Sequence, residues 1–158
     1  MGYGTPLKKT SIQPGGILVG QGVAASLTTA LTGTNNDLVF TARDRGTAGN
    51  STTISYVVSG ANTALAVTVT GTAISVAVAT NGSSAATSTA AQIAAAVLAS
   101  PAANGLVLTA NAASNDGTGV VVALSATALS GGADYVRGPR TGGIGPSSDY
   151  ASPVKRAI

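Results

Sequence analysis

The sequence predicts a mainly β (α+β) protein, an antiparallel sheet or sandwich-like domain with one packed helix and an extended arm at each end. Apolar residues alternate with small polar ones in short segments of the middle, which is the period of a strand. One segment, at about 89–100, has the composition of a helix, and both ends contain glycine and proline without any period. We therefore divide the 158-residue chain into an N-terminal arm (1–36), a core (37–133) and a C-terminal arm (134–158).

Four strands are predicted before the helix, each with one apolar and one small polar face, as is common in antiparallel sheets. They cover residues 38–41, 53–58, 65–70 and 73–78. The first strand ends at Ala42, and residues 43–50 are expected to form a loop. Strict alternation on both sides of Gly71 predicts that the third and fourth strands form a hairpin.

The helix is predicted from a capping box at its start. In Thr89-Ala90-Ala91-Gln92 the threonine hydroxyl and the glutamine amide each satisfy a free backbone N–H. Strong helix formers continue to Ala99, and Pro101 ends the helix. Ile93 and Val97 form only a thin apolar stripe, so the helix is expected to pack on the sheet.

Two strands are predicted after the helix, at residues 106–109 and 120–124. The second is a continuous apolar run, which predicts a strand buried on both faces. Gly131-Gly132 then closes the domain.

The composition excludes most kinds of active site. Alanine, glycine, threonine and serine occupy 88 positions, and the chain has no histidine, cysteine, glutamate or tryptophan. It therefore has no usual zinc site, no cysteine nucleophile and no Ser-His-Asp triad. Nothing in the sequence groups the five carboxylates, which are Asp37, Asp44, Asp116, Asp134 and Asp149. We predict no catalytic residue and no small-molecule substrate, so the protein is expected not to be an enzyme.

Two kinds of motif imitate ligand sites. Residues 20–25 match Gly-x-Gly-x-x-Ala, but strands of period 2 follow at once and Asp37 comes too early for a dinucleotide-binding acid. Residues 35–37 and 115–117 offer oxygen atoms to calcium, yet each supplies one carboxylate, and turn chemistry explains them better. We predict no cofactor and no metal.

The charges gather toward the ends of the chain. The net charge is +3, only 8% of residues are charged, and residues 46–133 contain a single charge, Asp116. The candidate partner-binding residues of the two arms are Lys8, Lys9, Ile17, Leu18, Val19, Tyr135, Arg137, Arg140, Tyr150, Lys155 and Arg156. Arg43-Asp44-Arg45 is a candidate charge cluster between subunits. The cations are few and lack interleaved aromatic residues, so we expect no nucleic acid as partner. No apolar stretch approaches about 18 residues, so we expect no membrane association.

Six segments of the core carry a resemblance to a known family. They are Asp37-Leu38-Val39-Phe40-Thr41-Ala42, Ala48-Gly49-Asn50, Ile54-Ser55-Tyr56-Val57, the hairpin 65–78, Thr87-Ser88-Thr89-Ala90-Ala91-Gln92-Ile93 and Ala128-Leu129-Ser130-Gly131-Gly132. In this order they resemble a structural module of tailed-phage virion proteins, found in capsid decoration or cement proteins and in some tail proteins. The resemblance covers roughly residues 37–133, about 60% of the chain. It implies no catalytic residues.

From the resemblance we expect a capsid cement or decoration protein, made in the host cytoplasm and located on the outer surface of the capsid. Its expected partner is the major capsid protein. An apolar surface with few charges and exposed strand edges also predicts a homo-oligomer, a dimer or a trimer. A tail-tube or tail-associated protein is the alternative. A bacterial surface or adhesin domain, which would need export, is a further one.

Overall fold

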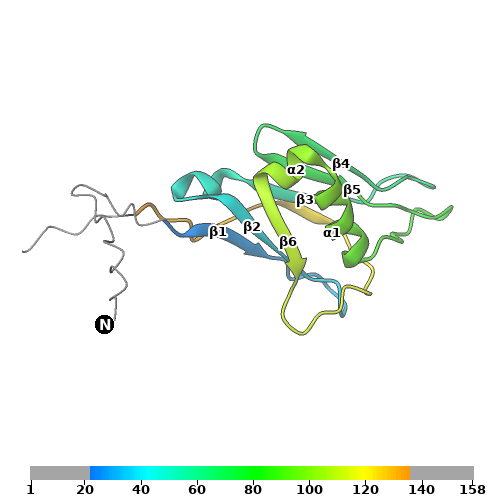
Figure 1. Cartoon of the computed structure of the whole chain (residues 1–158). Coiled ribbons are helices and arrows are strands. Elements are labelled where there is room, and N and C mark those ends of the chain that lie inside the picture. Colours follow the sequence, from blue (N-terminus) through cyan, green and yellow to red (C-terminus); the bar gives the residue numbers. More distant parts are fainter. Residues whose placement is uncertain (1–21, 136–158) are drawn as a thin grey trace, which may run out of the picture.

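The alternating strands bury their apolar faces against one another in two sheets (Figure 1). The structure is a computed structural model that describes residues 22–135. One sheet has the order β1-β2-β6, with β1 (Ala24–Thr28), β2 (Leu38–Arg45) and β6 (Val107–Asn111). The other has the order β4-β5-β3-β7, with β4 (Ala66–Thr70), β5 (Ala73–Ala77), β3 (Thr53–Val57) and β7 (Leu124–Ala128). The predicted mainly β class with a packed helix is confirmed.

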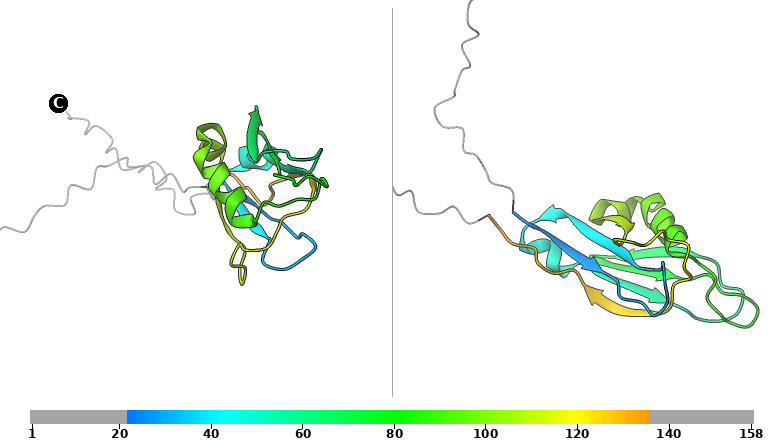
Figure 2. Two further views of the ribbon diagram at one scale, coloured as in Figure 1. Left: turned by 90° about the vertical axis from the view of Figure 1, so that its right-hand side faces the viewer. Right: turned by 90° about the horizontal axis from the view of Figure 1, so that it is seen from below.

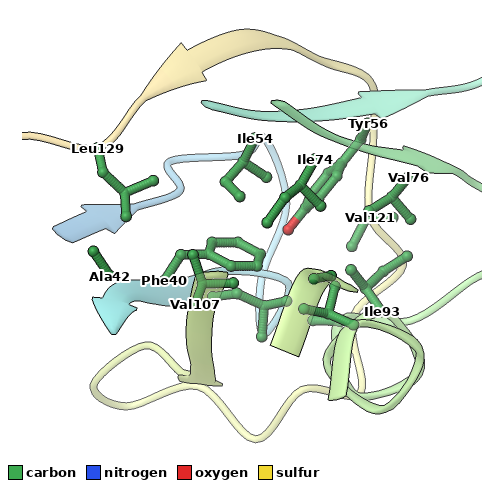
Figure 3. Packing of buried hydrophobic residues seen from close by; sticks show 14 of the residues in the cluster. Phe40, Ala42, Ile54, Tyr56, Ile74, Val76, Ile93, Val107, Val121 and Leu129 are labelled. Atoms are coloured by element: carbon green, nitrogen blue, oxygen red, sulfur yellow. The ribbon is translucent and has the colours of Figure 1, made fainter. Parts of the chain in front are cut away.

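The core lies between the two sheets, where aliphatic side chains surround a pair of aromatic rings (Figure 3). Phe40 of β2 meets Tyr56 of β3 edge to face, with ring centroids 6.5 Å apart. Such a pair adds about 0.5–1.5 kcal/mol to the stabilisation from buried area. Ile54, Ile74 and Val107 are fully buried around the rings. Strand alternation directs these residues inward, as the sequence predicts.

The helix α1 (Ala90–Ala99) begins at the predicted capping box. The Gln92 side chain accepts from the backbone N–H of Thr89 at 2.9 Å, and the Thr89 hydroxyl accepts from the N–H of Gln92 at 3.3 Å. Pro101 ends α1 but also begins a second short helix, α2 (Pro101–Leu106), which the sequence analysis missed. Proline is favoured at the first position of a helix, because it needs no N–H there.

Different connections close the two sides of the sandwich. On one side the chain leaves β7 and crosses to the free edge of β1, where Ser130 pairs with Ser26 and Ala133 with Val23. On the other side α1 lies beside β6, and both helices contact β4. Figure 2 shows the helices standing along this second side of the strands.

Two predicted boundaries are wrong at the N-terminal side of the core. The predicted arm of residues 1–36 overlaps the core, because β1 is a strand that pairs with β2 from Ala24↔Arg45 to Thr28↔Val39. The predicted loop 43–50 is wrong over its first residues, because this pairing extends β2 to Arg45. A short 3-10 helix, η1 (Thr47–Ser51), takes up most of the remaining loop.

The apolar run at residues 120–124 is not a doubly buried strand. Val121 is fully buried, but Val120 and Val122 are 45% and 37% exposed. Val120 makes only an isolated bridge to Thr89, and the strand β7 begins at Leu124. The run crosses between the two layers, so Val120, Val122 and Ala123 are exposed although all of the run is apolar.

One pair of strands is parallel, which differs from the antiparallel sheet predicted. The hairpin of β4 and β5 is confirmed, with Thr70↔Ala73 flanking a two-residue turn. However, β5 inserts between β4 and β3 and runs parallel to β3. The chain can reach this order because the connection after β3 carries β4 out to the edge of the sheet.

Candidate attachment site

The first and last described residues lie side by side at one end of the sandwich (Figure 2). The Val23 N–H donates to the Ala133 carbonyl at 2.8 Å, and the Ala133 N–H donates back to Val23 at 3.1 Å. The Gly46 N–H, after β2, also donates to the Val23 carbonyl at 2.9 Å. We call this junction the arm-exit pole and define it by residues 22–23, 46–50 and 132–134. Both predicted arms therefore adjoin the same place.

Glycine allows the three segments of the arm-exit pole to approach closely. A Cβ on Gly132 would collide with the backbone oxygen of Gly46 and lie 2.9 Å from the Asn50 Oδ1 atom. Gly46 has φ +100°, a conformation that other residues rarely adopt, and a Cβ there would collide with the Asp134 carboxylate. The close packing of the pole therefore depends on the absence of side chains.

Two polar side chains fasten the C-terminal segment to the turn after β2. Asn50 forms a pair of hydrogen bonds with the Gly132 backbone, donating to the carbonyl at 3.0 Å and accepting from the N–H at 2.9 Å. Asp134 accepts from the Thr47 N–H and from the Thr47 hydroxyl, both at 2.9 Å. These bonds, the backbone one first, hold the pKa of Asp134 below its ordinary value of 3.8. The carboxylate is therefore charged at neutral pH and binds Thr47 in that form.

The predicted charge cluster borders the arm-exit pole, but its members do not face one another. All three side chains are exposed, and the pairing of β2 with β1 is irregular beside them, between Thr41 and Arg45. Arg43 donates to the Asn104 backbone oxygen and, at 2.5 Å, to its side-chain oxygen. Arg45 donates to the Gly22 carbonyl at 3.4 Å. The arginines thus contact their own chain next to the pole, and a contact between subunits stays a prediction.

Of the predicted arm residues, only Tyr135 lies in the described part, directly after the arm-exit pole and 53% exposed. The others fall outside the described residues. They are Lys8, Lys9, Ile17, Leu18, Val19, Arg137, Arg140, Tyr150, Lys155 and Arg156.

Two other described carboxylates, Asp37 and Asp116, accept hydrogen bonds from nearby residues of their own loops. Asp37 accepts from the Leu31 N–H at 2.8 Å and from the Thr29 hydroxyl at 3.1 Å. Asp116 accepts from the hydroxyl and the N–H of Thr118, which lowers its pKa below 3.8. Within residues 22–135, no group of three or more potential metal ligands from His, Cys, Asp and Glu comes together.

The outer faces of the sheets form a second feature, which corresponds to the small polar strand faces that the sequence predicts. On the four-stranded sheet the central outward residues are small and uncharged; they include Thr53, Ser55, Val57, Ala66, Thr68, Thr70, Ala73, Ser75 and Ala77. On the three-stranded sheet Thr28, Val39 and Ala110 continue this composition. All four strands of the four-stranded sheet lie within residues 46–133, whose single charge is Asp116, whereas β2 of the three-stranded sheet carries Arg43, Asp44 and Arg45.

Comparison with known proteins adds no family: no family model matches the chain, and neither a curated protein nor a solved structure matches it. Among the described helices, none is both long and apolar enough to cross a membrane.

Proposed function

We propose that this chain is a non-enzymatic structural protein of a bacteriophage virion. Within that class we propose a capsid cement or decoration protein, which binds the major capsid protein on the outer surface of the shell and stabilises it. The protein is a homo-oligomer in this proposal, and the arms make the attachment. The resemblance of the core to virion modules supports the class, and the geometry of the arm-exit pole supports the mode of binding.

The observation that carries the proposal is the meeting of both chain exits at one fastened junction. Val23 and Ala133 pair directly, and Asn50 and Asp134 fix the C-terminal segment to the turn after β2. Two arms that leave from one point can bind neighbouring parts of one surface, and the second arm then binds at a high effective concentration. Fixing the exits also lowers the entropy that is lost when the arms bind.

The charge distribution supports the same mode of binding. The sequences of both arms contain basic residues and Arg43 and Arg45 lie beside the arm-exit pole, while the outer face of the four-stranded sheet is uncharged. A protein surface with acidic groups around the attachment point would therefore be complementary to this end of the molecule. This uncharged face is suited to close packing beside other copies or beside capsid subunits.

The composition argues against catalysis for the whole chain. A catalytic site requires titratable groups held in a cleft, and this sequence has neither histidine, cysteine nor glutamate to provide them. A structural role requires none of these groups.

The test is the removal of each arm at the boundary that the structure gives. Variants lacking residues 1–21 or 136–158 keep β1 and the arm-exit pole, so they are expected to melt like the full chain. Each variant is expected to bind poorly to capsids stripped of the protein, as measured by co-sedimentation. A variant that lacks both arms yet sediments at full occupancy would overturn attachment by the arms.

A second experiment separates the alternatives. Gold-labelled antibodies against the protein are expected to decorate heads of intact virions. Label along tails would support the tail protein instead. An exported surface domain predicts cleavage near Ala25, but Ala25 is fully buried in β1, so such a cut would divide a core strand. The N-terminal residue of the isolated protein, read by mass spectrometry, decides this point.

A further inference from the structure

The sandwich has four edge strands, and two of them, β1 and β7, are joined to a covering segment or irregular. Backbone hydrogen bonds join Ser26 of β1 to Ser130 at 2.8 and 3.0 Å, and α1 lies beside β6. The pairing of β7 with β3 shifts register between Ile54 and Tyr56, which indicates a bulge. Bulges and covering segments are known devices that protect an edge from pairing with another chain.

The edge strand β4 contacts both helices, as β6 contacts α1, but β4 has no bulge and no hydrogen-bonded covering segment within residues 22–135. It pairs with β5 in unbroken register from Ala66↔Ala77 to Thr70↔Ala73 and contains neither a charged residue nor a proline. Along its far side β4 makes no hydrogen bond to any other segment in residues 22–135. Figure 1 shows β4 at the rim of the sandwich. A regular, uncharged edge of this kind is a template for a further strand.

The side chains of β4 are also suited to pairing with a further strand. Val67 and Val69 point toward the core, as Leu65 does just before the strand, yet all three are only partly buried. Thr68, at the middle of the strand, is exposed on the outer face. Valine and threonine are favoured in strands, where they pack against cross-strand neighbours. A strand added beside β4 would extend the sheet and further bury the partly buried apolar row.

We infer that this strand is the β4 of a second copy, paired antiparallel about a two-fold axis at Thr68. In this register Thr68 faces Thr68 of the second copy, and Val67 faces Val69 of the second copy. A two-fold interface requires one surface to be complementary to itself, and an edge without charge meets its own copy without repulsion. The inference rests on the proposed function in one respect: this dimer is the homo-oligomer of that proposal.

The arrangement has a geometric consequence for the arms. Thr70, at the end of β4, lies on the side of the sheet toward the arm-exit pole. Two residues after Thr70, the Thr72 carbonyl accepts from the N–H of Thr53, which closely follows η1. Antiparallel pairing therefore places the two arm-exit poles at opposite ends of the dimer. One dimer would attach at two separate points and bridge them.

The experiment uses the purified full chain without capsids, so its failure is distinguishable from a failure of capsid binding. Sedimentation velocity at micromolar concentrations is expected to give twice the 15.0 kDa chain mass for the unchanged protein. Thr68→Lys places like charges opposite each other and is expected to raise the dissociation constant at least about tenfold. Circular dichroism is expected to show an unchanged fold, since Thr68 is exposed.

Two controls make the register specific. Ala126→Lys adds the same charge at an exposed position of β7 and is expected to leave the dimer intact. An equimolar mixture of Thr68→Lys and Thr68→Asp is expected to restore a dimer, because opposite charges then meet. Each of four results would overturn the inference. The unchanged protein could be monomeric, or the dimer could persist in Thr68→Lys. The dimer could also be lost in Ala126→Lys, or the mixture could stay monomeric.

Discussion

At the arm-exit pole three chain segments meet through hydrogen bonds, whereas in the sandwich core two sheets meet through apolar side chains. The pole depends on close backbone approach at glycines and on the side chains of Asn50 and Asp134. The core depends on Phe40, Tyr56 and the aliphatic residues around them. The core therefore determines whether the domain folds, while the arm-exit pole determines where the chain ends leave it.

The largest effect is expected in the core. Phe40→Ala removes the only phenylalanine of the chain from a fully buried position and is expected to lower the free energy of unfolding by about 3–5 kcal/mol. Leu108→Ala is the control, since Leu108 is 49% exposed on the outer face, and its cost is expected to stay within about 0.5 kcal/mol. Urea denaturation measures both. Equal losses would contradict the assignment of the core.

At the arm-exit pole, Gly132→Ala is expected to lower the free energy of unfolding by about 1–3 kcal/mol, because its Cβ would collide with the Gly46 backbone. Gly105→Ala in α2 is the matched control. A Cβ there meets open space, so the substitution is expected to raise stability by up to about 1 kcal/mol. Thermal melting of both variants compares them, and a neutral Gly132→Ala would show that the pole is not closely packed.

Tyr56→Phe is expected to stabilise the core by about 1 kcal/mol, because the buried Tyr56 hydroxyl has no hydrogen-bond partner among the described residues. Burial, and secondarily the charge of Asp37, raises the pKa of Tyr56 well above its ordinary value of 10.0. The folded state therefore keeps a proton that the unfolded state loses above pH 10. Stability should fall there by about 1.4 kcal/mol per pH unit.

Denaturation at a series of alkaline pH values checks this expectation. The Tyr56→Phe variant should lose that part of the slope, while its stability at neutral pH rises. An identical alkaline slope in both proteins would contradict the burial of an unpartnered phenol. Tyr135, which is exposed, serves as a control through Tyr135→Phe.

The smallest effect concerns the Asp134 carboxylate. Because its pKa is lowered in the folded state, its hydrogen bonds to Thr47 stabilise the pole above about pH 3.8 and are lost as pH falls through the folded pKa. The amide resonance of Thr47 should titrate with this midpoint and lose the titration in Asp134→Asn. Asp116→Asn is the control, since Asp116 bonds only to nearby Thr118. A Thr47 titration that survives in Asp134→Asn would assign the bond to another group.

The sequence predicted the parts that depend on local pattern. The capping box at Thr89, the alternating strand around Tyr56 and the hairpin around Gly71 are all present in the structure. Each is determined by residues within a few positions of one another, so neighbouring residues suffice to recognise it. The small and uncharged composition of the outer face of the four-stranded sheet was likewise present in the sequence.

Only the tertiary structure decided the boundaries and the strand order. The short segment of β1 has little apolar alternation of its own and becomes a strand because β2 offers it an edge. The apolar run at Val120 is exposed on one side because the chain crosses between layers there. The arm-exit pole joins Thr47 to Asp134 across 87 positions, and β4 becomes an edge because β5 inserts beside β3. Contacts of such long sequence separation leave no periodic signal, so the sequence alone determined the locally patterned elements, while the packing of distant segments determined the other elements and where all of them meet.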